Sequence, residues 1–412
     1  MLNWFHFTKV SGFEQSTAPS IRSIAVKSVL ALGACAISVA VSLCLGGTVH
    51  ESGTADSWNP RKAAAYLDQR EQWWLAWPVA ARDHGTVCVS CHTSLPYALA
   101  RPALRAALGE QAPSPGEQKL LESVTKRVHL WNEVAPLYSD EHSGKNKSHE
   151  SRGTESVLNA LVLVTRDAPG GQLSPGGQLS DDARAALANM WALQLAEGDR
   201  KGAWLWLQFG NEPFEAHDSD FYGAALAAVT TGAAGEAYRA APELRGHLAS
   251  LREYLGREYT KQSPMNQVVL LWASAKWPEL LSPEQRKAII SGIVSAQASD
   301  GGWNLASLTW SWRDWTVRSL VKTFTRSYGT ELQGISDGYA TAIVTYALEQ
   351  SGLGHDDPHV AQARAWLLRN QKAEGFWPSF SLNNQRDPYS ATGRFMSDAA
   401  TAYAVLALTE TN

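Results

Sequence analysis

The chain has 412 residues, a formal net charge of −4 at pH 7 and a pI of about 6.3. This length allows one large domain or two medium domains with well-buried cores. The slightly acidic balance gives no reason for a basic surface that would hold nucleic acid, so we expect no nucleic-acid partner.

The N-terminal region predicts export across a bacterial inner membrane. Residues 1–27 are polar to mixed and carry basic side chains, whereas residues 28–49 carry no charge. An uncharged run of this length can span a bilayer, and the preceding basic residues predict a cytoplasmic N-terminus. We expect a single-pass anchor, a linker over residues 50–58 and a periplasmic main domain. A cleaved signal, or a lipoprotein signal around residues 32–35, is the alternative, and both would also export the domain.

Residues 88–92 have the sequence Cys-Val-Ser-Cys-His, which is the attachment signature of c-type haem. Two thiols about one helical turn apart can add to the two vinyl groups of one porphyrin, and the histidine can ligate the iron. A disulfide, a redox dithiol or half of a zinc site would use the same residues. Zinc would need further ligands, and the other two cysteines lie in the uncharged N-terminal run. We expect one covalent haem c on Cys88, Cys91 and His92.

From residue 59 onward, runs rich in alanine, leucine and glutamate at helical spacing dominate, and strand signals are scarce. Four segments share a pattern in which an acidic residue follows Ser or Thr and precedes an alanine-rich apolar run. The hydroxyl suits a helix N-cap and the acid suits the first turn, so each segment predicts an inner helix. The four acidic residues are Glu155, Asp220, Asp337 and Asp398.

A longer amphipathic run precedes each of these segments and predicts an outer helix. The outer helices are expected at about residues 115–131, 180–196, 283–297 and 358–372. Hairpins near residues 240–277 and 59–108 bring the number of helical pairs to six. Such repeats cannot bury their apolar faces alone and must pack on their neighbours. We therefore predict an all-α fold, an (α/α)6 toroid over residues 59–412 with the haem motif in its first hairpin.

If the inner helices share one direction, their N-termini, the four acidic residues and the haem motif meet at one mouth of the ring. The acids would then form a polar rim with catalytic potential or, more simply, repeated helix caps. Trp73, Trp74 and Trp77 precede the motif and can pack on a porphyrin. The iron takes a sixth protein ligand or keeps an open position. Candidate sixth ligands are Met396, His149, His217, His84 and His142.

The phrases at residues 297–303 and 371–377, Gln-Ala-Ser-Asp-Gly-Gly-Trp and Gln-Lys-Ala-Glu-Gly-Phe-Trp, resemble the QW repeats of the squalene-hopene cyclase and protein prenyltransferase superfamily. Residues 194–204 hold a looser version. The resemblance implies an α/α toroid in which glutamine and tryptophan tie an outer helix to the next hairpin. It also implies a central cavity that takes isoprenoid chains. Residues 88–104 further resemble bacterial cyclase-like proteins in which a haem motif opens such a toroid.

Departures from this superfamily argue against its usual activities. The cyclases begin catalysis with an Asp-x-Asp-Asp acid, and residues 217–221, His-Asp-Ser-Asp-Phe, are one carboxylate short of it. Prenyltransferases hold zinc with Asp, Cys and His, whereas no cysteine follows Cys91. The resemblance therefore implies the fold but neither a squalene cyclase nor a zinc prenyltransferase.

We expect an exported, membrane-anchored monohaem c-type cytochrome on a cyclase-like toroid. It would transfer electrons or perform redox chemistry on an isoprenoid or lipid ligand in the cavity, and as an enzyme it would be a haem-dependent oxidoreductase. Its partner would be a redox protein or a quinone-linked chain. One alternative is a terpenoid- or lipid-binding toroid with a structural haem motif, and another is an (α/α)6 carbohydrate-active enzyme.

Overall fold

The computed structural model describes residues 57–169, 171–174, 176–309, 335–384 and 386–410. The chain divides into two compact units, Met1–Ser52 and Gly53–Asn412, and all described elements belong to the second. The expected cytoplasmic segment, the anchor or signal and most of the linker lie outside the described residues. Among the residues described, no helix combines the length and apolarity needed to cross a membrane.

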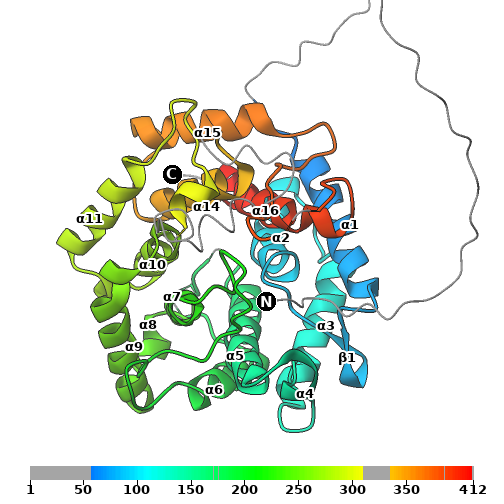
Figure 1. The fold of residues 1–412 in the computed structure, drawn as a ribbon, viewed down its shortest axis with the longest axis vertical. Coiled ribbons are helices and arrows are strands. Elements are labelled where there is room, and N and C mark those ends of the chain that lie inside the picture. Colours follow the sequence, from blue (N-terminus) through cyan, green and yellow to red (C-terminus); the bar gives the residue numbers. More distant parts are fainter. Residues whose placement is uncertain (1–56, 170, 175, 310–334, 385, 411–412) are drawn as a thin grey trace, which may run out of the picture. The chain divides into compact units, whose positions relative to one another are not determined.

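The described part of the second unit contains six helical hairpins, each made of an outer helix followed by an inner helix (Figure 1). The outer helices are α1 (Pro60–Ala76), α3 (Pro115–His129), α6 (Asp181–Ala192), α9 (Arg245–Glu258), α11 (Pro283–Val294) and α15 (Pro358–Asn370). The inner helices are α2 (Ser94–Leu108), α5 (Lys147–Asp167), α7 (Ser219–Ala233), α10 (Pro264–Lys276), α14 (Gly338–Gln350) and α16 (Phe395–Thr409). The prediction of an all-α, toroid-like fold is confirmed.

The inner helices form a closed ring. Each packs on the next in the order α2, α5, α7, α10, α14 and α16, and α16 packs back on α2 (Figure 1). Every residue of α7 is buried, because the inner helices α5 and α10 and the outer helix α9 pack on it. Closure leaves no terminal hairpin with an exposed apolar face.

Short elements fill the connections between the hairpins. Strands β1 (Ala81–Arg82) and β2 (Thr86–Val87) pair antiparallel, with Ala81 opposite Val87. The short helices α4 (Asp140–Ser143), α8 (Glu236–Arg239) and α12 (Leu305–Leu308) lie in other loops. The strand pair leads directly into residues 88–92, the predicted haem motif.

The Gln–Trp phrases join consecutive outer helices. The Gln297 side-chain amide donates to the carbonyl oxygens of Gly301 at 2.8 Å and His359 of α15 at 2.9 Å. The Trp303 indole N–H donates to the Ile293 carbonyl oxygen at 2.8 Å, which fixes the loop on its own outer helix. Gln194 and Trp204 make the corresponding bonds with Gly202, His247 and Met190.

The phrase at residues 371–377 closes the ring. The Gln371 side-chain amide donates to the carbonyl oxygens of Gly375 at 3.0 Å and Asn59 at 3.1 Å, and its Oε1 accepts from the Asn59 N–H at 2.7 Å. Asn59 is the N-cap of α1, so the last outer helix is tied to the first. The structural role implied by the QW resemblance is therefore present in the geometry.

The glycine in these phrases is required by both conformation and space. Gly301 and Gly375 have φ values of +97° and +98°, which L side chains rarely adopt. A Cβ on Gly301 would lie 2.8 Å from the Gln362 carbonyl oxygen, and one on Gly375 would lie 2.4 Å from that of Lys62. The loop therefore touches the backbone of the next outer helix.

The starts of the inner helices differ from the expected Ser/Thr caps. Helix α5 begins at Lys147, so Thr154 and Glu155 lie inside it, and Asp337 rather than a hydroxyl residue caps α14. The hydroxyl of Thr154 binds an incoming loop instead, because its Oγ1 accepts from the Leu207 N–H at 2.9 Å. A tertiary partner has thus replaced the local capping role that the sequence pattern suggests.

We predict that Gln371→Ala lowers the free energy of unfolding by about 2 kcal/mol, because three hydrogen bonds of about 0.5–1.5 kcal/mol each are lost at the ring closure. Urea titration of the purified protein measures this change. Gln69→Ala, at an exposed position of the same first hairpin, should change stability by less than about 0.5 kcal/mol. Equal effects of the two substitutions would contradict a closing role for Gln371.

Candidate functional site

The predicted haem motif forms the turn that leads into α2. Cys88 follows β2, and its backbone N–H donates to the Ala80 carbonyl oxygen at 2.9 Å. The Ser90 hydroxyl accepts from the backbone N–H groups of Thr93 at 3.2 Å and Ser94 at 3.0 Å, and so caps the helix start. The two cysteines therefore lie in a turn before the helix rather than on one helical turn.

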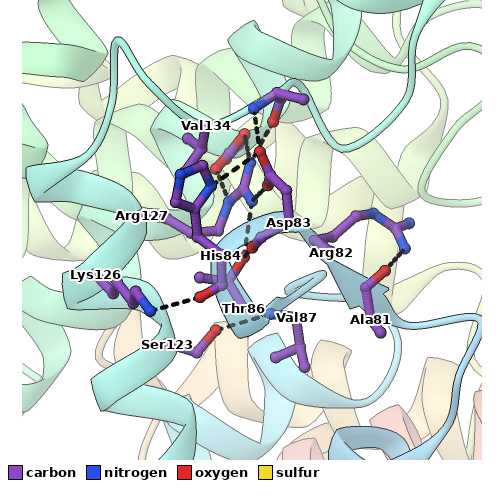
Figure 2. Close-up of polar contacts among 12 residues, drawn as sticks. Ala81, Arg82, Asp83, His84, Thr86, Val87, Ser123, Lys126, Arg127 and Val134 are labelled. Atoms are coloured by element: carbon purple, nitrogen blue, oxygen red, sulfur yellow. Dashed lines mark hydrogen bonds and ion pairs between the residues drawn. The ribbon is translucent and has the colours of Figure 1, made fainter.

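Helix α3 fixes the strand pair in front of the motif (Figure 2). The Arg127 guanidinium donates to Thr86 Oγ1 at 2.9 Å and pairs with Asp83 at 3.2 Å. The Val87 backbone N–H, next to the first cysteine, donates to Ser123 Oγ at 3.0 Å. These contacts set the position from which the chain enters the motif.

Aromatic rings enclose the histidine of the motif. His92 stacks on Phe395 of α16, with ring centroids 3.9 Å apart and an interplanar angle of 26°. Trp74 of α1 meets the imidazole edge-on at 5.2 Å, and its indole N–H donates to the Cys88 carbonyl oxygen at 2.7 Å. The cluster continues through Trp73 and Trp77. The tryptophans expected near a porphyrin thus lie beside the histidine that would ligate it.

A chain of hydrogen bonds leads from His92 to a buried ion pair. His92 Nδ1 lies 2.9 Å from Thr93 Oγ1, which donates to Asp398 Oδ2 at 2.8 Å. Asp398 also accepts from the Tyr66 hydroxyl at 2.8 Å and from Arg70 at 2.7 and 2.9 Å. Burial raises the pKa of Asp398, and the Arg70, Thr93 and Tyr66 donors oppose that rise. The carboxylate is paired and hydrogen-bonded, as burial requires.

Both motif cysteines are free thiols with only 6% and 7% of their surface exposed. Burial raises the pKa of Cys88 and raises that of Cys91 well above its ordinary value, and the charge of Glu215 adds to both increases. His92 is partly exposed, but its packed surroundings lower its pKa to about 3, with Arg386 and Arg70 adding to the decrease. At neutral pH the motif holds neutral thiols and a neutral imidazole.

This donor set fits a covalent haem c. Cys88 and Cys91 are unpaired, and the imidazole of His92 has Nδ1 engaged while no hydrogen bond to Nε2 is found among the described residues. Within the same residues, no group of three or more His, Cys, Asp and Glu side chains is arranged to hold a metal ion. From these residues alone, zinc would lack the additional ligands that it needs.

A guanidinium beside the same rings has no anionic partner among the described residues. Arg386 lies 5.2 Å from the Phe395 ring centroid, and neither a hydrogen bond nor an ion pair to its side chain is found within the described ranges. Burial lowers the pKa of its guanidinium. A partly buried cation of this kind suits the carboxylate of a ligand, and a haem carries two carboxylates.

The acidic residues expected at the rim are buried or partly buried, and all of them are engaged. Glu155 forms an ion pair with Arg127, with a second contact at 3.1 Å. Asp220 pairs with Arg200 at 2.6 Å and accepts from the Trp206 backbone N–H at 3.0 Å. Each of these two acids therefore ties its inner helix to its own outer helix or loop.

Asp337 and Asp398 make ties of the same kind. Asp337 accepts from the Leu305 backbone N–H at 2.6 Å and from the Ser379 hydroxyl at 2.9 Å. Asp398 holds Arg70 of the first outer helix. The four repeated acids thus hold neighbouring elements together. Among the described side chains, Asp398 is the one of the four that connects by hydrogen bonds, through Thr93, to His92 of the motif.

The candidate sixth ligands differ in position. Met396 is buried and directly follows Phe395, which contacts His92. His84 lies in the turn between β1 and β2, where its Nδ1 is 3.3 Å from Asp83 (Figure 2). The remaining three are exposed, namely His142, His149 and His217. Met396 is therefore a buried candidate that adjoins a residue in contact with His92, and the identity of a sixth ligand stays a prediction.

Two carboxyl groups near the motif were not expected from the sequence. Burial raises the pKa of Glu215 to about 7, against the opposing effects of Asn211 and Lys147. Burial raises the pKa of Glu71 to about 8, although the Ser94 hydroxyl donates to its Oε1 at 3.2 Å. No spacing rule marks either residue, because their surroundings follow from tertiary packing.

A cavity of about 470 Å³ lies at the other mouth of the ring. Its lining comes from the last turns of the inner helices and includes Ala106, Thr165, Ala233, Lys276, Gln350 and Thr409. Between the mouths, the ring centroids of Tyr339 and Tyr403 are 5.8 Å apart. Those of Tyr403 and Trp272, which lies in the cavity wall, are 6.3 Å apart. The haem motif and this cavity are thus separated by packed aromatic rings.

No protein family matches the chain, and no curated protein matches it either. Among solved structures, a chain described as a glycosidase variant is similar, with 13% sequence identity and a TM-score of 0.48. The similarity covers 85% of this chain and 95% of that chain. At this level it carries no conclusion about ligand or activity.

We predict that Glu71→Gln flattens the pH dependence of stability. The pKa of Glu71 rises from an ordinary value of 4.5 to about 8 in the fold, so the folded state holds the proton more tightly and stability falls as pH rises from about 4.5 to 8. Between pH 5 and 9 the native protein should lose about 4 kcal/mol more than the variant. Urea unfolding at both pH values measures the difference, and exposed Glu122→Gln is the control that should behave as the native chain.

Proposed function

We propose that this chain is an exported, membrane-anchored monohaem c-type cytochrome on a toroid-like helical domain, and that it transfers electrons. The observation that carries the proposal is the donor set itself. Cys88 and Cys91 are free thiols, and His92 is a neutral imidazole whose Nδ1 is engaged by Thr93. The two thiols would carry the porphyrin as thioethers and His92 would be the proximal ligand.

Bound haem c supplies a one-electron centre, and the residues around the motif suit its containment. Trp74 and Phe395 surround the imidazole and keep water from two of its sides. Arg386 offers a positive charge for a haem carboxylate. Because the thiols are almost fully buried, we expect attachment to precede the packing of α16 on α2.

The arrangement favours electron transfer over direct chemistry on a ligand in the ring. The cavity opens at the mouth away from the motif, and the rings of Tyr339, Tyr403 and Trp272 lie between them. A redox protein or a quinone-linked chain would therefore meet the protein at the motif's own mouth. The cavity has mostly apolar walls and supports a separate property, the binding of an isoprenoid or lipid chain.

We predict that protein made in a host able to attach haem c carries the mass of one haem and shows a reversible change in the visible spectrum on reduction. Cys88→Ala combined with Cys91→Ala should abolish covalent haem, because no thioether can form. The matched control is Cys35→Ser combined with Cys44→Ser, which should retain it. Intact mass and spectrum of each variant are the measurements. Native protein without added mass would overturn the proposal.

We predict that Arg386→Gln lowers the midpoint potential of the haem, because loss of a neighbouring positive charge stabilises the oxidised iron. A charge interaction of about 1 kcal/mol corresponds to about 40 mV for one electron. Potentiometric titration measures the change. Arg386→Lys keeps the charge and should stay near the native potential, whereas an equal drop in both variants would assign the effect to packing on Phe395 instead.

A further inference from the structure

We infer that Thr93 is a positioning residue that fixes which nitrogen of His92 carries a proton, a role that rests on the proposed haem site. Within the described ranges, the motif histidine does not bond to a carboxylate directly. Instead, Thr93 stands between His92 and Asp398, with separations of 2.9 Å and 2.8 Å. The hydroxyl therefore connects the candidate iron ligand to the Arg70–Asp398 ion pair.

The hydrogen bonds of Asp398 determine the direction of this chain. Arg70 donates to both carboxylate oxygens, from Nε to Oδ1 at 2.7 Å and from Nη2 to Oδ2 at 2.9 Å. The Tyr66 hydroxyl donates to Oδ1 as well, at 2.8 Å. A carboxyl group that receives a two-point guanidinium contact and a phenol donor is an acceptor only. The bond between Asp398 and Thr93 must then use the proton of the threonine.

Proton counting gives the state of the imidazole. A hydroxyl has one proton, and Thr93 uses it toward Asp398. Thr93 Oγ1 can therefore only accept from His92, so Nδ1 carries the proton of the neutral ring. Nε2 is left with a free lone pair, which is the form that ligates a metal.

The neighbouring contacts keep this chain in one arrangement. Arg70 Nη2 also donates to the Ala391 carbonyl oxygen at 2.7 Å, so the guanidinium is held on both sides. Phe395 stacks on the imidazole and restricts rotation of the ring. Thr93 itself is buried, with 2% of its surface exposed, so water does not compete for its hydroxyl.

The consequence is a histidine with increased electron-donating power. Donation from Nδ1 to a hydroxyl that itself donates to a carboxylate raises the basicity of the imidazole. If haem is attached, a more basic His92 would stabilise the oxidised iron and would lower its potential. Removing the hydroxyl at position 93 should therefore favour the reduced form.

The test compares full-length native protein with Thr93→Val and Thr93→Ser, made with and without haem attachment. For the haem-loaded forms, we expect Thr93→Val to keep the covalent haem and to raise the reduced-to-oxidised ratio at a fixed potential about ten-fold, or 59 mV. Thr93→Ser retains a hydroxyl and should match the native protein. An unchanged ratio in a haem-loaded Thr93→Val variant would overturn the inference while leaving the cytochrome proposal intact.

The haem-free forms give an independent readout. In ¹⁵N-histidine-labelled native chain, the nitrogen shifts of His92 should report a protonated Nδ1 and an unprotonated Nε2, and Thr93→Val should shift the population toward protonated Nε2. This measurement decides the role of Thr93 even if no haem attaches, which would refute only the proposed function. If Thr93→Val does not fold, a native chain with protonated Nε2 on His92 would still overturn the inference.

Discussion

The buried ion pair between Arg70 and Asp398 joins two parts of the chain that are 328 residues apart. Arg70 belongs to the first outer helix and Asp398 to the last inner helix, so this contact forms across the junction where the ring closes. A buried pair of this kind is costly to break, because one charge would be left without compensation. The same carboxylate also holds Thr93, and through it the orientation of His92 depends on closure.

This dependence explains why the candidate site lies at the ring junction. The first hairpin supplies the cysteines, the histidine and Trp74, whereas the sixth supplies Phe395 and Asp398. Neither hairpin alone would enclose the imidazole. The residues around the imidazole are brought together only when α16 packs on α1 and α2, so the enclosed site depends on closure of the ring.

Three junctions between consecutive outer helices, α6 to α9, α11 to α15 and α15 to α1, use the same set of contacts. A glutamine at the end of an outer helix bonds to the start of the next, and a glycine at positive φ lets the loop touch that helix. The tryptophan of the phrase fills the space behind the loop and is fully buried, as at Trp303 and Trp377. Each of these junctions contacts two hairpins. The stability of the domain therefore depends on the contacts between hairpins as well as on the individual helices.

Much of the architecture could be predicted from the sequence alone. Helical periodicity located the six hairpins, although α5 begins at Lys147, seven residues before the Thr154 that starts its Thr-Glu pattern. An amphipathic outer helix and an alanine-rich inner helix leave different patterns, so the two types could be told apart. The Gln–Gly–Trp phrases marked the joints, and residues 88–92 marked the candidate haem site. These features are local, so their spacing along the chain was sufficient to find them.

The partners of those residues were decided only by the tertiary structure. A hydroxyl expected to cap an inner helix binds a loop instead, as Thr154 does with Leu207, because a partner from another part of the chain competes with the local cap. Nothing in the spacing connects Arg70, Thr93 and Asp398, and Glu71 acquires its raised pKa only through burial. Hydrogen bonds and ion pairs between distant segments form only after the ring has closed. A short motif such as residues 88–92 holds its reactive groups close together in the sequence, so it can be recognised without the fold.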